Sequence, residues 1–311
     1  MRILTLVLLA PFTAEFLLGD QYLAGTPELG RQLGMFALYV AFYGAAALLI
    51  REAARRAGRG WPTILTLALA FGVFEEGLLT QTLFNPHYLG LDLLSFGHVP
   101  GLGIGGPWTL YVLTLHVVWS IGAPIAVAET LFGREPWLKK VGLSLWSVSL
   151  VVGAVATFAI TYSFAPFVAP VAQLAGAALV VVALAVAAFR FRAPAWTSTP
   201  GRPWVAFALG LGASTAFQLV FRLMDSLPWL MVGLLLVIEL ATVFAVTRLR
   251  PPAFPLAAGA LITYCWLGLK TASEAGSTAV FEQSALILVT VALLVVTVRR
   301  VRTPVSVLKV H

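Results

Sequence analysis

Two adjacent glutamates, Glu75 and Glu76, interrupt the apolar stretch LALAFGVFEEGLLTQTLF at residues 67–84. A carboxylate at bilayer depth costs several kcal/mol unless it is protonated, paired or hydrated, so each one marks a candidate functional site. Two neighbouring carboxylates cannot both ionise cheaply without a cation. Either one stays protonated, or a basic side chain compensates, or a metal ion binds.

A histidine lies in the next apolar stretch and could act as a metal ligand together with the two glutamates. Carboxylate and imidazole ligands suit a divalent metal such as zinc, with a position left for water. Glu75, Glu76 and His116 are therefore the candidate catalytic residues, and with His98 they form the candidate metal-ligand set. His116 has a plainer alternative role, a hydrogen bond between helices.

Depth along each apolar stretch predicts which side chains share a level. At ~1.5 Å per residue, Glu75, Glu76, His116 and Glu239 lie ~12–17 Å beneath the outer surface, and Glu15 lies nearer the mouth. Adjacent helical residues point in different directions, so only one of the two glutamates can face an interior cavity. The other should contact a neighbouring helix or bond a partner such as Thr80, four residues after Glu76.

The composition identifies the elements that must position these groups. Of the 311 residues, 60% are hydrophobic and 11% are charged, against about 25% charged in soluble proteins. Apolar runs of about 18 residues or more, long enough to cross a membrane, recur along the chain. We predict an all-α, polytopic transmembrane helix bundle with ten spans. The predicted spans are 3–19, 33–50, 61–84, 107–132, 141–163, 168–189, 203–224, 228–247, 253–270 and 280–298.

Basic residues fix the orientation of these spans. With the N-terminus inside, every even-numbered span is followed by a basic patch, and the inner segments hold most of the 20 Lys and Arg residues. This pattern follows the positive-inside rule and predicts that both termini are cytoplasmic. It also accounts for the net charge of +7, so nucleic acid is excluded as a partner. Glu129, near an inner helix end, should reach water or Arg134.

We expect one integral membrane domain over residues 1–311, in a bacterial cytoplasmic membrane. The lipid bilayer is the partner that the sequence identifies, and a protein or small-molecule partner stays open. The connection 85–106 is long, rich in glycine and half apolar. Such a segment fits a re-entrant or lid-like loop on the outer side better than a free loop.

The order of these residues resembles the CPBP intramembrane metalloproteases, which are the CAAX prenyl proteases and their bacterial abortive-infection-like relatives. That family carries EExxxR, FxxxH and HxxxN or HxxxD on three helices, and the resemblance covers residues 61–132. Glu75-Glu76 match the start of the first motif, with Thr80 in place of its Arg. His116 either ends FxxxH, with Val112 in place of Phe, or starts HxxxN, with Ser120 in place of Asn. His98, following Leu94, would be the other histidine.

The resemblance implies that the first glutamate activates a water molecule and that the histidines help to hold a divalent metal or the oxyanion. Two other classes of function stay open. In a proton-coupled secondary transporter, Glu75, Glu76 and Glu239 would carry protons or bind a cationic solute. In a non-catalytic scaffold or accessory subunit, the carboxylates would pair helices through groups such as Arg222 and Gln218.

Overall fold

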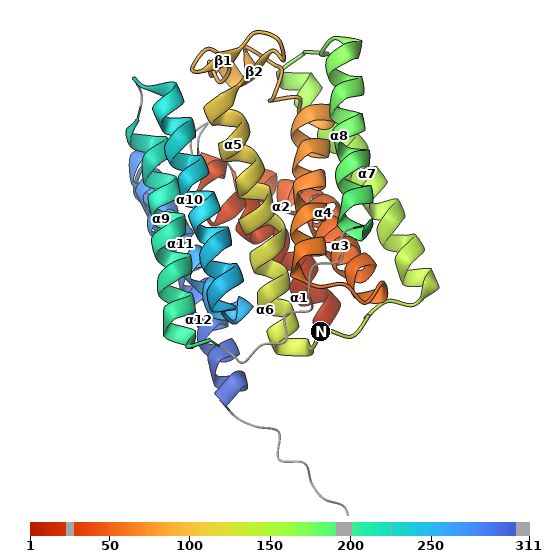
Figure 1. The fold of residues 1–311 in the computed structure, drawn as a ribbon, viewed down its shortest axis with the longest axis vertical. Coiled ribbons are helices and arrows are strands. Elements are labelled where there is room, and N and C mark those ends of the chain that lie inside the picture. Colours follow the sequence, from red (N-terminus) through yellow and green to blue (C-terminus); the bar gives the residue numbers. More distant parts are fainter. Residues whose placement is uncertain (23–27, 191–200, 225, 303–311) are drawn as a thin grey trace, which may run out of the picture.

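The computed structural model describes residues 1–22, 28–190, 201–224 and 226–302, and its helices form one bundle (Figure 1). Nine helical stretches within these ranges are long and apolar enough to cross a membrane. They are Leu29–Arg56, Trp61–Leu79, Gly106–Phe132, Lys140–Phe164, Val171–Arg190, Pro203–Leu223, Pro228–Leu249, Ala253–Ala275 and Ser277–Arg302. The predicted class, an all-α bundle of membrane-spanning helices, is confirmed.

Three of these stretches are interrupted by a π-helical segment. The first comprises α2 (Leu29–Tyr39), η3 (Val40–Gly44) and α3 (Ala45–Arg56); the second α4 (Trp61–Phe74) and η4 (Glu75–Leu79); the third α5 (Gly106–Leu115), η6 (His116–Gly122) and α6 (Ala123–Phe132). The remaining stretches are α7 (Lys140–Phe164), α8 (Val171–Arg190), α9 (Pro203–Leu223), α10 (Pro228–Leu249), α11 (Ala253–Ala275) and α12 (Ser277–Arg302).

The first predicted span is shorter than expected. It consists of α1 (Arg2–Pro11), continued by the π-helical η1 (Phe12–Phe16), and a 3-10 turn η2 (Asp20–Tyr22) follows. At ~1.5 Å per residue this stretch is about 22 Å long, less than the ~30 Å hydrocarbon core. Leu6 and Leu17 are fully buried. One face of the segment is therefore packed inside the bundle under other helices, whereas Leu4 and Leu8 on its other face are exposed.

Both described ends of the chain lie at the same end of the bundle, where Figure 1 marks the N-terminus and where α12 ends. We call this the basic end, because it also holds Arg51, Arg55 and Arg56 of α3. The opposite end, where β1 and β2 lie beyond α5, is called the loop end (Figure 1). The arrangement agrees with the predicted placement of both termini on one side.

The third span ends earlier than predicted. Its helix stops at Leu79 rather than at Asn85-Pro86, and Gln81 adopts a left-handed backbone with φ 56°. The Gln81 side chain accepts a hydrogen bond from the Ala169 N–H at 2.7 Å, which holds the chain in this turn. Glu75 and Glu76 therefore lie about one turn from the helix end, and the predicted depth of ~12–17 Å is wrong.

The loop between η4 and α5 is structured. It contains the 3-10 turn η5 (Tyr88–Gly90) and a short antiparallel hairpin of β1 (His98–Val99) and β2 (Ile104–Gly105). Gln173 of α8 donates a hydrogen bond to the Leu102 carbonyl at 2.9 Å. A Cβ at Gly103, which has φ +66°, would lie 2.4 Å from Gln173 Nε2. The glycines of this loop thus permit its close contact with α8.

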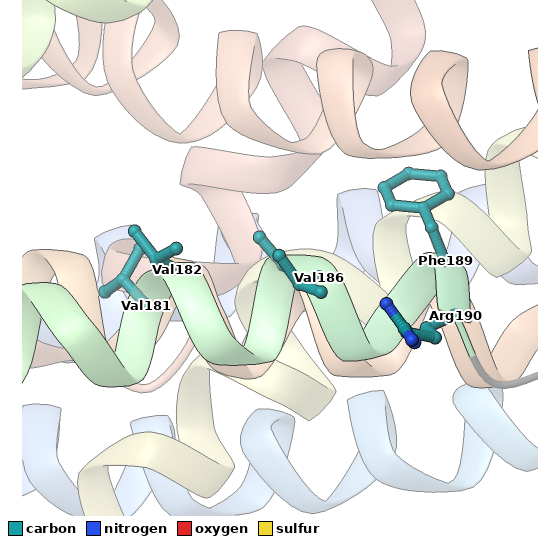
Figure 2. Close-up of a pocket in the computed structure, with 6 residues that line it drawn as sticks. Val181, Val182, Val186, Phe189 and Arg190 are labelled. Carbon is teal, nitrogen blue, oxygen red and sulfur yellow. The ribbon is translucent and has the colours of Figure 1, made fainter.

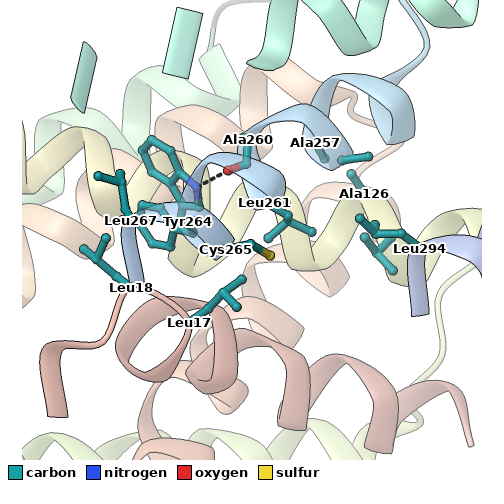
Figure 3. Packing of buried hydrophobic residues seen from close by; sticks show 14 of the residues in the cluster. Leu17, Leu18, Ala126, Ala257, Ala260, Leu261, Tyr264, Cys265, Leu267 and Leu294 are labelled. Atoms are coloured by element: carbon teal, nitrogen blue, oxygen red, sulfur yellow. Dashed lines mark hydrogen bonds between the residues drawn. The ribbon is translucent and has the colours of Figure 1, made fainter. Parts of the chain in front are cut away.

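The main core joins the first segment, α6, α11 and α12 (Figure 3). Trp119 stacks on Tyr264 with ring centroids 4.3 Å apart and donates its indole N–H to the Ala260 carbonyl. Helices α9 and α11 cross at glycines, since a Cβ at Gly259 would lie 2.4 Å from the Phe207 carbonyl oxygen. Small residues at a crossing let two backbones approach closely.

The outward faces of α7, α8, α10 and α12 expose many large apolar side chains. The hollow of about 760 Å³ drawn in Figure 2 lies on such a face, because all its lining residues belong to α8. These are Val181, Val182, Ala185, Val186, Phe189 and Arg190. In a membrane this surface is suited to acyl chains, and it brings together no groups for chemistry.

A buried ion network fixes the basic end. Arg51, fully buried, bonds Glu52 at 2.8 Å, and its Nε lies 3.1 Å from Glu129 Oε1. Arg55 donates to both oxygens of Glu129, at 2.7 and 2.6 Å. Arg134, the expected partner of Glu129, is 4.0 Å away and is mostly exposed. Glu129 therefore joins α6 to α3 rather than reaching water.

The same network holds the connection after α6. Glu52 accepts hydrogen bonds from the backbone N–H groups of Trp137 and Leu138, at 2.6 and 3.1 Å. The Arg51 guanidinium lies 3.4 Å from the centre of the Trp137 ring. Buried charges with this many partners are costly to disturb, because removing one leaves the others unpaired.

We predict that Glu129→Gln destabilises the protein by about 3–5 kcal/mol, because Arg51 and Arg55 lose a buried counter-charge. The measurement is the melting temperature of purified protein in detergent. Glu135→Gln is the matched control, since the Glu135 side chain is exposed, and it should melt like the wild type. Equal melting temperatures for both variants would contradict a stabilising role for the network.

Candidate metal centre

The structure brings together three of the four predicted ligands. Glu75 and Glu76 project from η4 and His116 from η6, and one ligand atom from each lies within 4.8 Å of the others. Their exposed fractions are 3%, 6% and 5%. In the described part of the chain this is the group of His, Cys, Asp and Glu side chains that could hold a metal ion. We call it the Glu-Glu-His cluster.

The imidazole of His116 lies between the two carboxylates. Its Nε2 is 2.8 Å from Glu76 Oε1, and its Nδ1 is 3.4 Å from Glu75 Oε2. The Ser120 hydroxyl is 3.3 Å from the same Nδ1. A Cβ at Gly72 would lie only 3.1 Å from the His116 Cβ. The missing side chain at Gly72 therefore lets α4 approach closely enough for both glutamates to reach one ring.

Glu76 is held by hydroxyl groups on its other oxygen. Thr80 donates to Glu76 Oε2 at 3.0 Å, as predicted from their spacing of four residues, and Thr82 donates to the same oxygen. Trp108 of α5 donates its indole N–H to the Thr82 hydroxyl at 3.2 Å. Both Glu76 oxygens are thus engaged, and this carboxylate is fixed in one orientation.

Glu75 has one occupied and one free oxygen. Tyr43 of η3 donates its hydroxyl to Glu75 Oε1, whereas Glu75 Oε2 is buried and makes no hydrogen bond. The Tyr43 ring stacks on His116, with centroids 6.1 Å apart and planes inclined by 13°. Phe71 contacts the His116 ring edge-on at 5.9 Å. Apart from its 3.4 Å ion-pair contact with His116 Nδ1, Glu75 Oε2 has no partner, so it is the atom of the cluster that can take a further hydrogen bond.

Sequence reasoning missed Tyr43. Its hydroxyl group within the apolar run FYGAAALLI, next to Gly44, was the available signal. A Cβ at Gly44 would lie 2.4 Å from the Val7 carbonyl oxygen. That close approach of the first segment and η3 places Tyr43 inside the bundle, where it can reach Glu75.

Four π-helical segments of the described chain each contribute a polar side chain to this region. Glu15 lies in η1, Tyr43 in η3, the two glutamates in η4 and His116 in η6. Thr13 of η1 also donates to the Trp119 carbonyl of η6 at 2.7 Å. π-helical turns are rare and often occur at functional sites. Their convergence distinguishes this region from an ordinary helix contact.

Glu15 lies beside the cluster but is not part of the ligand group. It is half-buried and close enough to Tyr43, His116 and Glu76 to interact with them electrostatically. Asp20, just beyond the first segment, interacts in turn with Glu15 and Arg222. Burial raises the pKa of the Asp20 carboxyl to about 7, with a further contribution from Glu15. Carboxyl groups thus continue from the cluster toward α9.

Two predicted residues lie elsewhere. His98, the fourth predicted ligand, is exposed on β1, where it pairs with Gly105. Glu239 is half-buried on α10 and accepts a hydrogen bond from the Thr114 hydroxyl at 2.6 Å. Neither belongs to the ligand group. Although Glu239 was predicted at the same depth as the cluster, it does not reach it, because its side chain points toward Thr114 of α5.

The charges of the cluster are balanced only in part. Within the described residues His116 is the ion-pair partner of Glu75 and Glu76, with no Lys or Arg within 4.0 Å of either. Two ionised carboxylates with a protonated imidazole carry a net charge of −1, which is costly in a buried site. A divalent ion with a neutral imidazole, or an additional proton, would bring the total to zero.

A model of an uncharacterised membrane protein family matches residues 4–310. No curated protein and no solved structure shows a significant match to the chain. Because the match covers nearly the whole sequence, the chain belongs to this uncharacterised family of membrane proteins.

Proposed function

We propose that the protein is a metal-dependent intramembrane hydrolase, related in its chemistry to the CPBP metalloproteases, with its centre at Glu75, Glu76 and His116. The observation that supports this most is the convergence of the three ligand atoms within 4.8 Å, without a Lys or Arg partner among the described residues. Two carboxylates and a neutral imidazole form a donor set for zinc or a similar divalent ion.

Two of the positions at which the sequence departs from the CPBP motifs also support the proposal. Thr80 stands in place of the motif Arg, and it donates to Glu76. Ser120 stands in place of the motif Asn, and it lies 3.3 Å from His116 Nδ1. Both side chains contact the same groups that the motif alignment would assign to a common site, so different residue types orient the glutamate and the imidazole here.

A metal ion bound there would polarise a carbonyl group and favour ionisation of a water molecule. The chain itself supplies the base, because Glu75 Oε2 is buried without a hydrogen bond while Tyr43 holds Oε1. Glu75 can therefore accept a proton from a water molecule placed at its free oxygen. Glu76, fixed by Thr80 and Thr82, would hold the metal ion together with His116.

Access is best explained from the loop end. A cavity of about 160 Å³ is lined by Asp92, Leu93, Phe96, Pro107, Trp108 and Phe221. Trp108 is also the donor to Thr82, which in turn bonds Glu76. The cavity thus lies two hydrogen bonds from the cluster, on the side that the charge pattern assigns to the exterior of a bacterial cytoplasmic membrane.

A proton-coupled carrier is the second candidate. It is favoured by the imidazole lying between two carboxylates, because such a group exchanges protons readily. A carrier needs an additional proton at the cluster, whereas the hydrolase needs a metal ion. The two proposals therefore differ in what the purified protein contains.

We expect the wild-type protein, purified in detergent after growth with zinc, to hold about one divalent ion per chain. Glu76→Gln and His116→Ala should reduce this content to background, because each removes a ligand. Elemental analysis by mass spectrometry measures the content. Glu239→Gln is the control and should retain the ion. A metal-free wild type that refolds and melts normally would exclude the metal centre.

Tyr43→Phe should lower the affinity for the divalent ion about 10–100-fold, because the Tyr43 hydroxyl, which orients the Glu75 carboxylate, is lost. Competition with a chelator of known affinity measures this change. Tyr39→Phe is the matched control, since Tyr39 contacts the Tyr43 ring at a centroid distance of 5.5 Å. Equal affinities in the wild type and Tyr43→Phe would exclude Tyr43 as a positioning residue.

Wild-type protein in proteoliposomes, mixed with membrane proteins of the source cell, should generate new peptide termini that quantitative mass spectrometry detects. Glu75→Gln should lower this rate about 10²–10⁴-fold, because the proposed base is removed. A wild type that releases no new termini but acidifies or alkalises the vesicle lumen in a Glu75-dependent way would replace the hydrolase with the carrier.

A further inference from the structure

A second polar cluster lies between α5, α9 and α11. It comprises Tyr111 of α5, Gln218 and Arg222 of α9, and Tyr264 of α11, and we call it the Arg-Tyr cluster. The Tyr111 hydroxyl donates to Gln218 Oε1 at 2.9 Å, and Arg222 Nη1 donates to the Tyr111 hydroxyl oxygen at 3.0 Å. Arg222 also donates to Gln218 Oε1.

Two buried groups of this cluster lack hydrogen-bond partners. Gln218 Nε2 and the Tyr264 hydroxyl are unpartnered, although both residues have exposed fractions of 0%. Leaving a buried polar group unpaired costs about 1–3 kcal/mol. Gln218 Oε1 already accepts two donors, so the amide N–H₂ is the free end of this side chain. Unpaired groups in this setting favour a ligand with acceptor oxygens.

Rigid aromatic contacts hold the donors in place. Tyr111 stacks on Phe221 with ring centroids 3.6 Å apart and on Phe217 at 5.8 Å. Tyr264 is held by its stack on Trp119 at 4.3 Å. Tyr264 also lies close enough to Tyr111, Asp20 and Arg222 to interact with them electrostatically. Arg222 is exposed at the loop end of α9, and its guanidinium points toward the Tyr111 hydroxyl.

The Arg-Tyr cluster also neighbours the route to the Glu-Glu-His cluster. Phe221, stacked on Tyr111, lines the loop-end cavity together with Trp108. The rings of Trp108 and Tyr111 lie 6.1 Å apart. A ligand that enters this cavity therefore reaches Phe221, which stacks on Tyr111, and Trp108, which donates to Thr82.

We propose that Arg222, Gln218 and Tyr264 bind an oxyanion, a phosphate or carboxylate group, that enters at the loop end. Arg presents a planar fork of N–H donors that matches such a group. The Gln218 amide and the Tyr264 hydroxyl would supply further donors from the buried side. That this oxyanion belongs to the molecule cleaved at the Glu-Glu-His cluster rests on the proposed function. The binding site itself does not.

The same chemistry is presented by free phosphate and by the headgroup of an anionic lipid. We therefore test both sources with purified full-length protein. Inorganic phosphate is titrated in detergent at constant ionic strength, and the melting temperature is recorded. In parallel, nanodiscs of phosphatidylglycerol or phosphatidylcholine are compared for the lipids that the protein retains in native mass spectrometry.

We expect a saturable rise in melting temperature with phosphate, selective retention of phosphatidylglycerol, or both. Tyr264→Phe, which removes one hydroxyl, and Arg222→Gln should each weaken the response at least about tenfold, since charge-assisted hydrogen bonds are lost. Arg31→Gln is the control, because Arg31 is exposed on α2. A response to phosphate alone identifies a soluble ligand, and one to phosphatidylglycerol alone identifies a lipid.

The site is overturned if neither probe gives a response, or if Tyr264→Phe and Arg222→Gln both respond like the wild type. The variant Glu75→Gln distinguishes failure of the oxyanion site from failure of the proposed hydrolase. It should retain the oxyanion response, because Glu75 is not part of the Arg-Tyr cluster. Loss of the metal ion with an intact oxyanion response would leave the binding site standing without the metal centre.

Discussion

The interaction on which the rest of the site depends is the contact of one imidazole with two buried carboxylates. Within the bundle, water cannot solvate the charges of Glu75 and Glu76, and in the described chain no Lys or Arg compensates them. His116 is thus the shared partner that brings η4 and η6 together. Gly72 permits the approach, while Tyr43, Thr80 and Ser120 orient the three groups.

The bundle compensates buried charge in two different ways. At the basic end, Arg51 and Arg55 form ion pairs with Glu52 and Glu129, and backbone N–H groups donate to Glu52. Every member has several partners, which suits a structural role. In the Glu-Glu-His cluster an oxygen of Glu75 stays without a hydrogen bond and the charges balance only with an added proton or metal ion. Incomplete satisfaction of this kind is what a site for water, protons or a ligand requires.

The polar side chains around the Glu-Glu-His cluster lie on irregular, π-helical parts of the backbone. An inserted residue in a π-helical turn changes the direction in which the following side chains point, so it can aim polar groups at a common centre. Here η1, η3, η4 and η6 each carry a polar side chain of the region. The Arg-Tyr cluster, by contrast, is built on regular helices and obtains its geometry from aromatic stacking. The cavity at the loop end lies beside both clusters, because its lining residue Trp108 donates to Thr82, which bonds Glu76, and its lining residue Phe221 stacks on Tyr111.

The sequence by itself determined the membrane-spanning class and the shared side of the two termini, and it singled out Glu75, Glu76 and His116 as buried polar groups, because apolar run length, basic patches and buried charge follow from the cost of leaving water. It placed the end of the third span too late, made the first span too long, counted His98 among the metal ligands and set Glu239 at the level of the cluster. Only the tertiary structure decided those points, and it alone revealed Tyr43. Which side chains meet depends on π-helical turns and on glycine contacts between helices, and neither leaves a periodic signal in the chain.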